Sequence, residues 1–534
     1  AIAIVLKKKA AIFTDGRYSN QIIKEVNPKI FEIQHIKNFN FWLYKNLKNK
    51  STLAIDPFLF SNKDIVDLKK NLNSKKISFI FTKKNPIDII WKNKPKKPRS
   101  KAFILQSKFS GKKTITKFNE IRKDMKKDLS DYYFTASLDS IAWITNLRGK
   151  DLEYSPLNLA YFLIPSKGKA ILYIDLNKIN RNIFSKLNSI INFVDIKYIK
   201  DDLKYIPKYS KISVDSKKTP YWFISFFKFQ NLKIKFIEDY VYLRKAIKNK
   251  IEINGSINAN IRDGASITKF LYWLYSYKKN NLSENKASKK LLEFRKKNKY
   301  FFSLSFKTIS AYGKNAALPH YTSSSKKDNF FKKNNIYLFD SGGQYFDGTT
   351  DITRTIIIGR AKKEQKEYFT RVLKGHISLI MTKFKNTTRG SDIDYIARKS
   401  LNEINSDYEH GTGHGIGSFL NVHEGPQRIS KSIINNDSIL KPGMILSIEP
   451  GYYKINSYGI RIENLVIIKK EKKDFLSFKT ISFAPIDKNL ILPNLLTHKE
   501  KKWLNEYHQN VFIKLYNYLN NNEKKWLKKI IQPL

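Results

Sequence analysis

Two acid-bearing strand–turn–strand stretches constrain this chain more than any other feature of its sequence. In the first, the apolar run NIYLF leads into DSGGQYFDGTTD (340–351), and the β-branched run ITRTIII follows. Such runs around a glycine-containing turn predict paired antiparallel strands, which would bring Asp340 and Asp351 close together. Two adjacent carboxylates repel each other unless a cation or a proton lies between them. A hairpin in which Asp and Gly serve only as turn formers explains this stretch equally well.

The second stretch, MILSIEPGYYKINSYGIRIENLVII (444–468), favours a site over a simple turn. It again predicts a strand, a glycine-containing turn and a strand, with Glu449 ending the first strand and Glu463 inside the second. A glutamate within a β-branched run is costly to bury alone. Two such hairpins in one domain predict that four carboxylates converge.

Three of the eight histidines lie in HGTGHGIGSFLNVHEGP (410–426), among five glycines that let the backbone approach a ligand closely. Four carboxylates and one imidazole suit two divalent ions, with Mn²⁺ expected and Fe²⁺, Co²⁺ or Zn²⁺ as alternatives. Two ions ~3.5–4 Å apart activate a shared water for hydrolysis of amides or phosphate esters. The other histidines outside this cluster and outside LPHYT are interpreted as core or surface residues: His35, His376, His498 and His508.

The 534 residues are too many for a single core and predict two or three domains. Short apolar runs alternating with helical stretches predict an α/β domain over 1–95, a basic, proline-containing linker at 91–100 and a second α/β domain over 96–242. Long helical patterns, strand pairs with glycine turns and two terminal helices predict an α+β domain over 243–534. No apolar stretch approaches the ~18–20 residues that span a bilayer, and the absence of cysteine fits a reducing compartment.

The net charge of +54 first suggests a nucleic-acid partner. However, the basic residues are 85 Lys and only 15 Arg, spread along the chain, and Asn, Ile, Phe and Tyr are also abundant. AT-rich codons supply these residues, so codon drift explains the charge. A protein that reads nucleic acid more often concentrates arginine on one element, because arginine binds guanine and phosphate bidentately. We therefore expect no specific nucleic acid and no membrane as partners.

Taken together, the motifs resemble those of the pita-bread metallopeptidases, and among them the long, three-domain aminopeptidase P group. The resemblance covers nearly the whole chain. It implies two creatinase-like N-terminal α/β domains, the first truncated at its start, then a pita-bread catalytic domain, in a cytoplasmic homodimer. Besides the three stretches above, it rests on TDGRY (14–18), SLDSIAWITNLRG (137–149), LSFKTISAYGKNAALPHYT (304–322) and KKWLNEYH (501–508).

The resemblance also implies a role for each matching residue. The activity it implies is release of the N-terminal residue from peptides with proline at position two, by a hydroxide held between two ions. Glu449 would also be the general base, and Asp347 matches no ligand position. The metal ligands would be Asp340, Asp351, His414, Glu449 and Glu463, with Asp351 and Glu463 bridging. The substrate-binding residues would be His320 and His423, which stabilise the oxyanion, with His410, Arg461 and Arg17.

Other proteins of this fold remain as alternatives. A prolidase-type Xaa-Pro dipeptidase is the hardest to separate, although the three-domain length and the C-terminal helices favour aminopeptidase P. Methionine aminopeptidases lack two added N-terminal domains, and creatinase-like hydrolases do not need the metal ligands. Non-catalytic peptidase-like binding proteins usually have eroded ligands, whereas all five are intact here.

Overall fold

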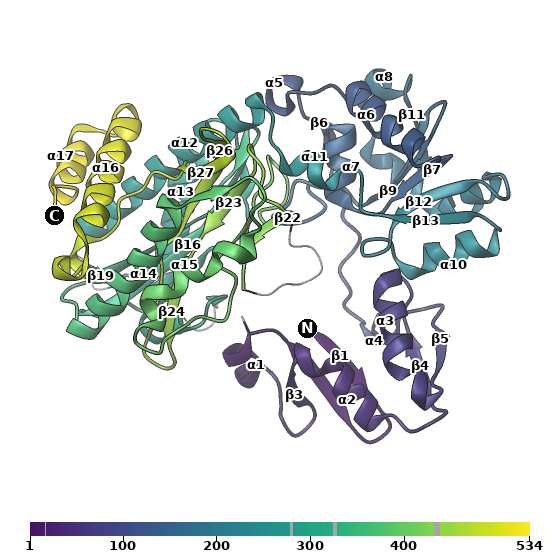
Figure 1. Ribbon diagram of the computed structural model, residues 1–534, viewed down its shortest axis with the longest axis horizontal. Helices are drawn as coiled ribbons and strands as arrows, with labels where there is room; N and C mark the ends of the chain where they lie inside the picture. The colour runs from purple at the N-terminus through teal and green to yellow at the C-terminus, as the bar shows by residue number, and fades with distance from the viewer. Residues whose placement is uncertain (17, 278–280, 324–327, 432–437) are drawn as a thin grey trace. The chain divides into compact units, whose positions relative to one another are not determined.

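The structure of the protein, a computed structural model, describes residues 1–16, 18–277, 281–323, 328–431 and 438–534 (Figure 1). The chain divides into two compact units. The first comprises Ala1–Phe13 and Glu32–Lys245, and the second comprises Thr14–Phe31 and Ala246–Leu534. Segment 14–31, which carries TDGRY, thus belongs to the second unit although its neighbours in sequence belong to the first. Among the described residues, no helix combines the length and the hydropathy that crossing a bilayer requires.

The first unit opens with a small α/β arrangement. Its elements are β1 (Ile2–Val5), β2 (Ala10–Thr14), β3 (Glu32–His35), α2 (Phe39–Asn46), β4 (Thr52–Ile55), α3 (Asn62–Leu72), β5 (Ser78–Phe81) and α4 (Pro86–Ile90). β1, β2 and β3 form one sheet, and β4 pairs parallel with β5. The capping box between Ser61 and Asp64 starts α3. Phe13, Trp42 and Ile65 lie in the shared core.

A six-stranded sheet organises the rest of the first unit, in the order β11-β10-β9-β7-β12-β13. Its elements are β6 (Phe103–Ile104), α5 (Ser107–Ser110), α6 (Thr114–Lys127), β7 (Tyr132–Thr135), α7 (Leu138–Thr145), β8 (Leu147–Arg148), β9 (Ala160–Pro165), β10 (Ala170–Ile174), α8 (Arg181–Leu187), β11 (Ile191–Asp195), α9 (Ile199–Asp202), β12 (Lys211–Asp215), α10 (Tyr221–Phe229), β13 (Lys233–Ile237) and α11 (Tyr242–Ala246). Strand β9 is antiparallel to both neighbours, whereas β7, β12 and β13 are parallel. Phe134, Ile212 and Phe223 pack in its core.

The helices of the second unit are α1 (Ser19–Glu25), α12 (Lys250–Ser276), α13 (Glu284–Lys296), α14 (Lys363–Met381), α15 (Gly390–Asn402), α16 (His498–Leu515) and α17 (Asn521–Ile530). The predicted long helical patterns and two terminal helices are among them, whereas α1 and α15 were not predicted. A capping box between Asn249 and Glu252 starts α12. α14 and α15 pack side by side (Figure 1), and α16 packs against both α12 and α14.

The strands of the second unit form several short sheets around the site. They are β14 (Phe301–Leu304), β15 (Ile309–Tyr312), β16 (Asn335–Ser341), β17 (Gly343–Tyr345), β18 (Gly348–Thr349), β19 (Ile352–Ile358), β20 (Lys383–Lys385), β21 (Gly413–Gly415), β22 (Glu424–Ile429), β23 (Ile445–Ile448), β24 (Gly451–Lys454), β25 (Tyr458–Arg461), β26 (Asn464–Lys470) and β27 (Phe475–Thr480). The largest sheet has the order β20-β27-β26-β23-β21-β22, and β15-β16-β19 form a second sheet.

Both acid-bearing stretches are antiparallel ladders that break into a separate short hairpin at the tip. β16 pairs with β19 and β23 pairs with β26, whereas the tips β17–β18 and β24–β25 belong to other sheets. The prediction that Glu463 lies inside a strand is wrong, because it occupies the break between β25 and β26. In each stretch the main strand pairing stops where the short tip hairpin leaves the sheet. The four acids lie at or next to these two interruptions.

Candidate metal centre

The two broken ladders deliver four carboxylates. Asp340 is the second-last residue of β16, and Asp351 immediately precedes β19; Glu449 follows β23, and Glu463 precedes β26. Asp340, Asp351 and Glu463 are at most 8% exposed. Both predicted strand pairings are confirmed, and each pair of acids lies where its antiparallel ladder opens.

His414 enters from β21, the neighbour of β23 in the largest sheet. Its Nδ1 lies 3.0 Å from the carbonyl oxygen of Gly415, so the Nδ1–H donates and the Nε2 lone pair is left for a ligand. That Nε2 lies 3.5 Å from Asp351 Oδ2 and 3.5 Å from Glu449 Oε1. This is the tautomer that a metal-binding imidazole needs.

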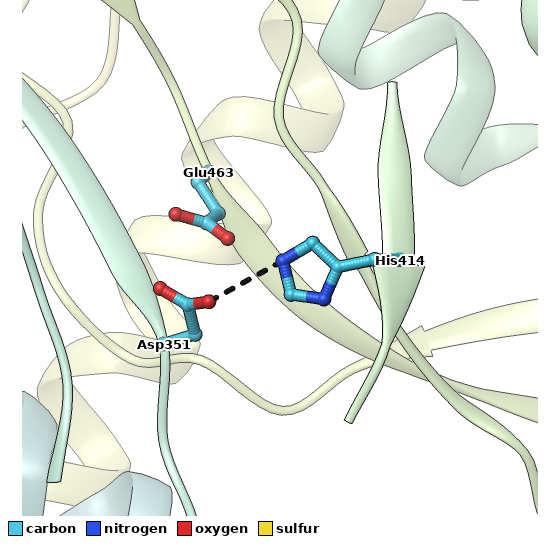
Figure 2. Close-up of side chains that lie close together, drawn as sticks. All are labelled: Asp351, His414 and Glu463. Atoms are coloured by element: carbon cyan, nitrogen blue, oxygen red, sulfur yellow. Dashed lines mark ion pairs between the residues drawn. The ribbon is translucent and has the colours of Figure 1, made fainter. Parts of the chain in front are cut away.

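Three of the side chains meet at one point. Figure 2 shows Asp351, His414 and Glu463 pointing toward one another from three strands or strand ends, and each offers a donor atom within 4.8 Å of the other two. Asp340 and Glu449 line the same cavity. The five predicted ligand residues are therefore brought together, from positions spread over more than a hundred residues of the chain.

The carboxylates are electrostatically frustrated without a cation. Burial raises the pKa of Asp351 well above its ordinary value, and repulsion from Asp340 and Glu449 raises it further. Burial also raises the pKa of Glu463 far above its usual range, with repulsion from Asp351 and Glu449 added. For Glu449, burial raises the pKa, while His414 and Arg461 partly oppose the shift. A bound cation would remove this penalty.

Two carboxylate oxygens give an independent test of whether cations fit. Among the described residues, Asp340 Oδ1 and Glu463 Oε1 are buried with no hydrogen-bond partner, whereas the second oxygen of each residue is bonded. Asp340 Oδ2 accepts from Arg461 Nη2 at 2.7 Å, and Glu463 Oε2 accepts from the Thr353 hydroxyl at 2.8 Å. Buried polar atoms are rarely left unsatisfied. The donor set of four carboxylates and one imidazole fits divalent cations.

A chain of hydrogen bonds links three residues beside the proposed ligands: Arg461, Tyr453 and His410. Arg461 Nη1 donates to the Tyr453 hydroxyl at 2.6 Å, and that hydroxyl lies 2.8 Å from His410 Nε2. His410 Nδ1 lies 2.9 Å from the Gly411 carbonyl, so its Nε2 accepts and Tyr453 donates. Burial lowers the pKa of His410 to about 3, and the charge of Arg461 adds to this shift. His410 is therefore neutral.

The site opens into a cavity of about 830 Å³, whose lining residues all belong to the second unit. His320 and His423 line it, and the His423 ring stands edge-on to His414 with centroids 4.2 Å apart. His320 Nδ1 lies 3.0 Å from the Tyr18 hydroxyl. Arg17, the remaining predicted substrate-binding residue, lies outside the described residues.

Sequence reasoning missed several supporting residues. Thr353 lies two residues after Asp351, so the two-residue alternation of a strand could have identified it. Ser447 accepts from the backbone N–H of His414 at 3.0 Å and donates to Glu449 at 3.2 Å; it precedes Glu449 by two and could have been found in the same way. Tyr453 carried no such signal, because its hydroxyl contacts Arg461 eight residues further along the chain and His410 from another segment.

Asp347 does not join the centre, as predicted from its mismatch to a ligand position. Its Oδ1 accepts from Arg262 Nη2 at 2.5 Å, and both side chains are at most 10% exposed. This ion pair joins the tip between β17 and β18 to α12 instead.

Three family models match consecutive parts of the chain. They are the creatinase/prolidase N-terminal domain over residues 93–252, metallopeptidase family M24 over 257–470, and the C-terminal region of peptidase M24 over 474–534. Among curated relatives, the probable Xaa-Pro aminopeptidase P of Laccaria bicolor is 36% identical over 536 residues, which cover 96% of this chain and 82% of the relative. The protein of that name from Podospora anserina is 37% identical, covering 97% and 79%.

Solved structures distinguish two groups of relatives. The X-prolyl aminopeptidase of Caenorhabditis elegans, described as a cytosolic enzyme with a di-nuclear active site, has a TM-score of 0.93 and 30% identity, covering 100% of this chain and 90% of its own. The prolidase of Pyrococcus furiosus has a TM-score of 0.53 and 26% identity, covering 68% and 98%. The predicted fold, creatinase-like N-terminal α/β domains followed by a pita-bread domain, is confirmed, and the full-length match favours the aminopeptidase over the prolidase.

Proposed function

Because the chain belongs to the aminopeptidase P branch of metallopeptidase family M24, we propose that it releases the N-terminal residue from peptides whose second residue is proline. The observation that carries the proposal is the convergence of Asp351, His414 and Glu463 on one point, with unpartnered oxygens of Asp340 and Glu463 beside it. Such an arrangement is costly for the protein unless cations bind there.

The five ligand residues, Asp340, Asp351, His414, Glu449 and Glu463, would hold two divalent ions, and Mn²⁺ is the metal we propose. When bound, the ions would lower the pKa of a shared water and polarise the substrate carbonyl. Two carboxylates would bridge them, Asp351 and Glu463, which are the two that the structure buries most deeply among the four. The orphaned oxygens support the assignment of Asp340 and Glu463 as ligands.

Glu449 would be the general base. It takes the proton of the attacking water and passes it to the prolyl nitrogen as the peptide bond breaks. The Ser447 hydroxyl, which donates to it at 3.2 Å, would fix its orientation.

The cavity residues would bind and orient the peptide. His320 and His423 would donate hydrogen bonds to the carbonyl oxygen as it gains negative charge, and both line the cavity. Arg461 would hold Asp340, with which it forms a 2.7 Å ion pair, and neutral His410 would line the site beside it. Arg17 would hold the peptide from segment 14–31, whose residues Asp15, Gly16 and Tyr18 also line the cavity.

The properties of proline explain why an enzyme specific for this residue at position two would be needed. Its nitrogen carries no hydrogen, and its ring fixes φ near −65°, so peptidases that need that N–H or an extended backbone fail on such substrates. A cavity of about 830 Å³ is large enough for a tripeptide.

The wider assignments are also part of this proposal. Residues 1–95 and 96–242 would be two creatinase-like domains and 243–534 the catalytic domain with its helical extension, in a cytoplasmic homodimer. Peptides with proline at position two would be its partners, with no specific nucleic acid and no membrane. The cytosolic description of the Caenorhabditis elegans enzyme supports the location.

The test is hydrolysis of Arg-Pro-Pro by chelator-stripped protein, with and without Mn²⁺. We expect manganese-dependent release of arginine, and Glu449→Gln should abolish it. Asp347→Asn is a matched control, because this acid lies in the first hairpin but pairs with Arg262, and it should retain activity. Cleavage of Ala-Pro but not of Arg-Pro-Pro would instead indicate a prolidase. A folded, metal-loaded protein that cleaves neither would contradict the proposal.

A further inference from the structure

The motif KKWLNEYH (501–508) has no part in the mechanism above. It lies on α16, within the region that the C-terminal family model matches. Tyr507 and His508 are buried, at 6% and 0% exposure, although both carry polar groups. Buried polar groups require partners, so the contacts of these two residues indicate what the C-terminal region does.

The hydroxyl of Tyr507 contacts buried residues of the second unit. It accepts from Arg354 Nη2 at 2.7 Å and lies 2.9 Å from the carbonyl oxygen of Ala484. Trp503, one turn earlier on α16, stacks on the Tyr507 ring with an interplanar angle of 3°. The stacking fixes the ring, so the hydroxyl is presented to Arg354 in one orientation.

Arg354 connects this hydroxyl to a proposed metal ligand. It lies on β19, three residues after Asp351, and is 1% exposed. Its Nη1 donates to the backbone carbonyl of Glu463 at 2.7 Å, and its Nη2 donates to the side-chain oxygen of Asn464 at 2.8 Å. The guanidinium thus bridges Tyr507 and the backbone at Glu463.

Glu463 needs such support because it lies at a break in the sheet. The ladder between β23 and β26 begins at Asn464, paired with Ile448, so the carbonyl of Glu463 falls outside it. Asn464 is itself held on its other side, where its Nδ2 lies 3.0 Å from His376 Nε2. The backbone that aims the Glu463 carboxylate is therefore held by the side chains of Arg354 and Asn464, together with one backbone hydrogen bond from the Glu463 N–H to the Thr353 carbonyl at 3.3 Å.

We infer that Tyr507 is a positioning residue for the metal centre: through Arg354, the C-terminal extension holds the Glu463 backbone where its carboxylate can bind a cation. This inference rests on the proposed function, since it requires a metal centre at Glu463. Outer-shell hydrogen bonds of this kind commonly change metal affinity 10–100-fold when removed.

The experiment compares full-length variants as chelator-stripped proteins. Tyr507→Phe removes only the hydroxyl and keeps the ring that stacks on Trp503. We expect its affinity for Mn²⁺, measured by titration calorimetry, to fall about 10–100-fold, and kcat/KM for Arg-Pro-Pro to recover in part at high Mn²⁺. Tyr518→Phe, an exposed tyrosine that follows the same helix, should bind Mn²⁺ normally.

A second control separates positioning from simple stabilisation. His508 lies next to Tyr507 on the same helix, and its Nε2 accepts from the backbone N–H of Ile486 at 3.1 Å. This hydrogen bond does not connect the helix to Glu463. His508→Gln should lower the melting temperature without a comparable loss of Mn²⁺ affinity. If Tyr507→Phe does not fold, Arg354→Lys is tested in its place, because lysine keeps a positive charge at that position. The same loss of Mn²⁺ affinity is expected.

The possible outcomes are distinct. Normal Mn²⁺ affinity in folded Tyr507→Phe, whatever its melting temperature, would overturn the inference, as would equal affinity losses in Tyr507→Phe and His508→Gln. An unaltered protein that binds no metal would contradict the proposed function instead.

Discussion

Replacing Asp351 with asparagine should stabilise the metal-free protein while it destroys metal binding. The carboxyl is 4% exposed and its neighbours include Asp340 and Glu449. Burial first, and then repulsion from these acids, raise its pKa in the folded, metal-free state. Asparagine has nearly the same shape and carries no charge, so it removes the penalty.

The size of the effect follows from proton linkage. The folded pKa of Asp351 is raised above the ordinary value of 3.8, so the folded state binds the proton more tightly. Its contribution to stability is present below that ordinary value and is lost as pH rises, by about 1.4 kcal/mol per pH unit until the folded group ionises. Relaxation of the neighbours limits the penalty, and we expect the substitution to raise the free energy of unfolding by about 2 kcal/mol at pH 8.

The assay is urea unfolding at pH 4 and pH 8 with a chelator, and again with Mn²⁺. The metal-free Asp351→Asn variant should be more stable than the unaltered protein at pH 8 and nearly equal to it at pH 4. Saturating Mn²⁺ should reverse the order, because ligand at a hundred times its Kd adds about 2.7 kcal/mol to the protein that binds it.

Asp347→Asn provides the matched control in the same loop. It removes the partner of Arg262, an ion pair with side chains 9–10% exposed, and should destabilise the protein by roughly 1–3 kcal/mol at pH 8. If metal-free Asp351→Asn is no more stable than the unaltered protein at pH 8, the carboxylates are not frustrated and the electrostatic reasoning fails.

Three further predictions follow from single contacts. Gly342→Ala should weaken Mn²⁺ binding and cost about 1–3 kcal/mol in unfolding experiments, because the added methyl group would overlap the Thr350 carbonyl and the Ser305 hydroxyl; unchanged affinity would contradict this. Tyr453→Phe should lower kcat/KM about 10–100-fold with the fold intact, since it removes the hydroxyl between Arg461 and His410, and circular dichroism with steady-state kinetics tests it. Burial lowers the pKa of His508 to about 3, so as pH falls the unfolded chain binds a proton at this histidine before the folded protein does. The free energy of unfolding therefore decreases below pH 6.5, by up to about 1.4 kcal/mol per pH unit. His508→Gln should therefore flatten the pH dependence of unfolding between pH 6.5 and 5, and an equal slope in both proteins would refute the assignment.

The sequence alone predicted the five proposed ligand residues, but few of the residues that support them. Strand pairing follows from β-branched runs and turn residues that are neighbours in the chain, so local pattern is enough to place Asp340 beside Asp351. The resemblance placed Arg461 at the site, where its guanidinium donates to Asp340 at 2.7 Å. The identity of the donors predicted hard divalent ions, because ligand chemistry does not depend on the fold.

Only the tertiary structure decided how these parts are aimed and held. The break before β26 puts Glu463 outside the ladder, and local patterns do not show where a hairpin tip leaves its sheet. The contact of Tyr453 with His410 joins residues 43 apart, and that of Tyr507 with Arg354 joins residues 153 apart. Periodicity describes one element at a time, whereas these hydrogen bonds depend on how separate elements pack. For that reason the chain's sequence specifies which atoms can bind metal, and its packing specifies which of them face one another.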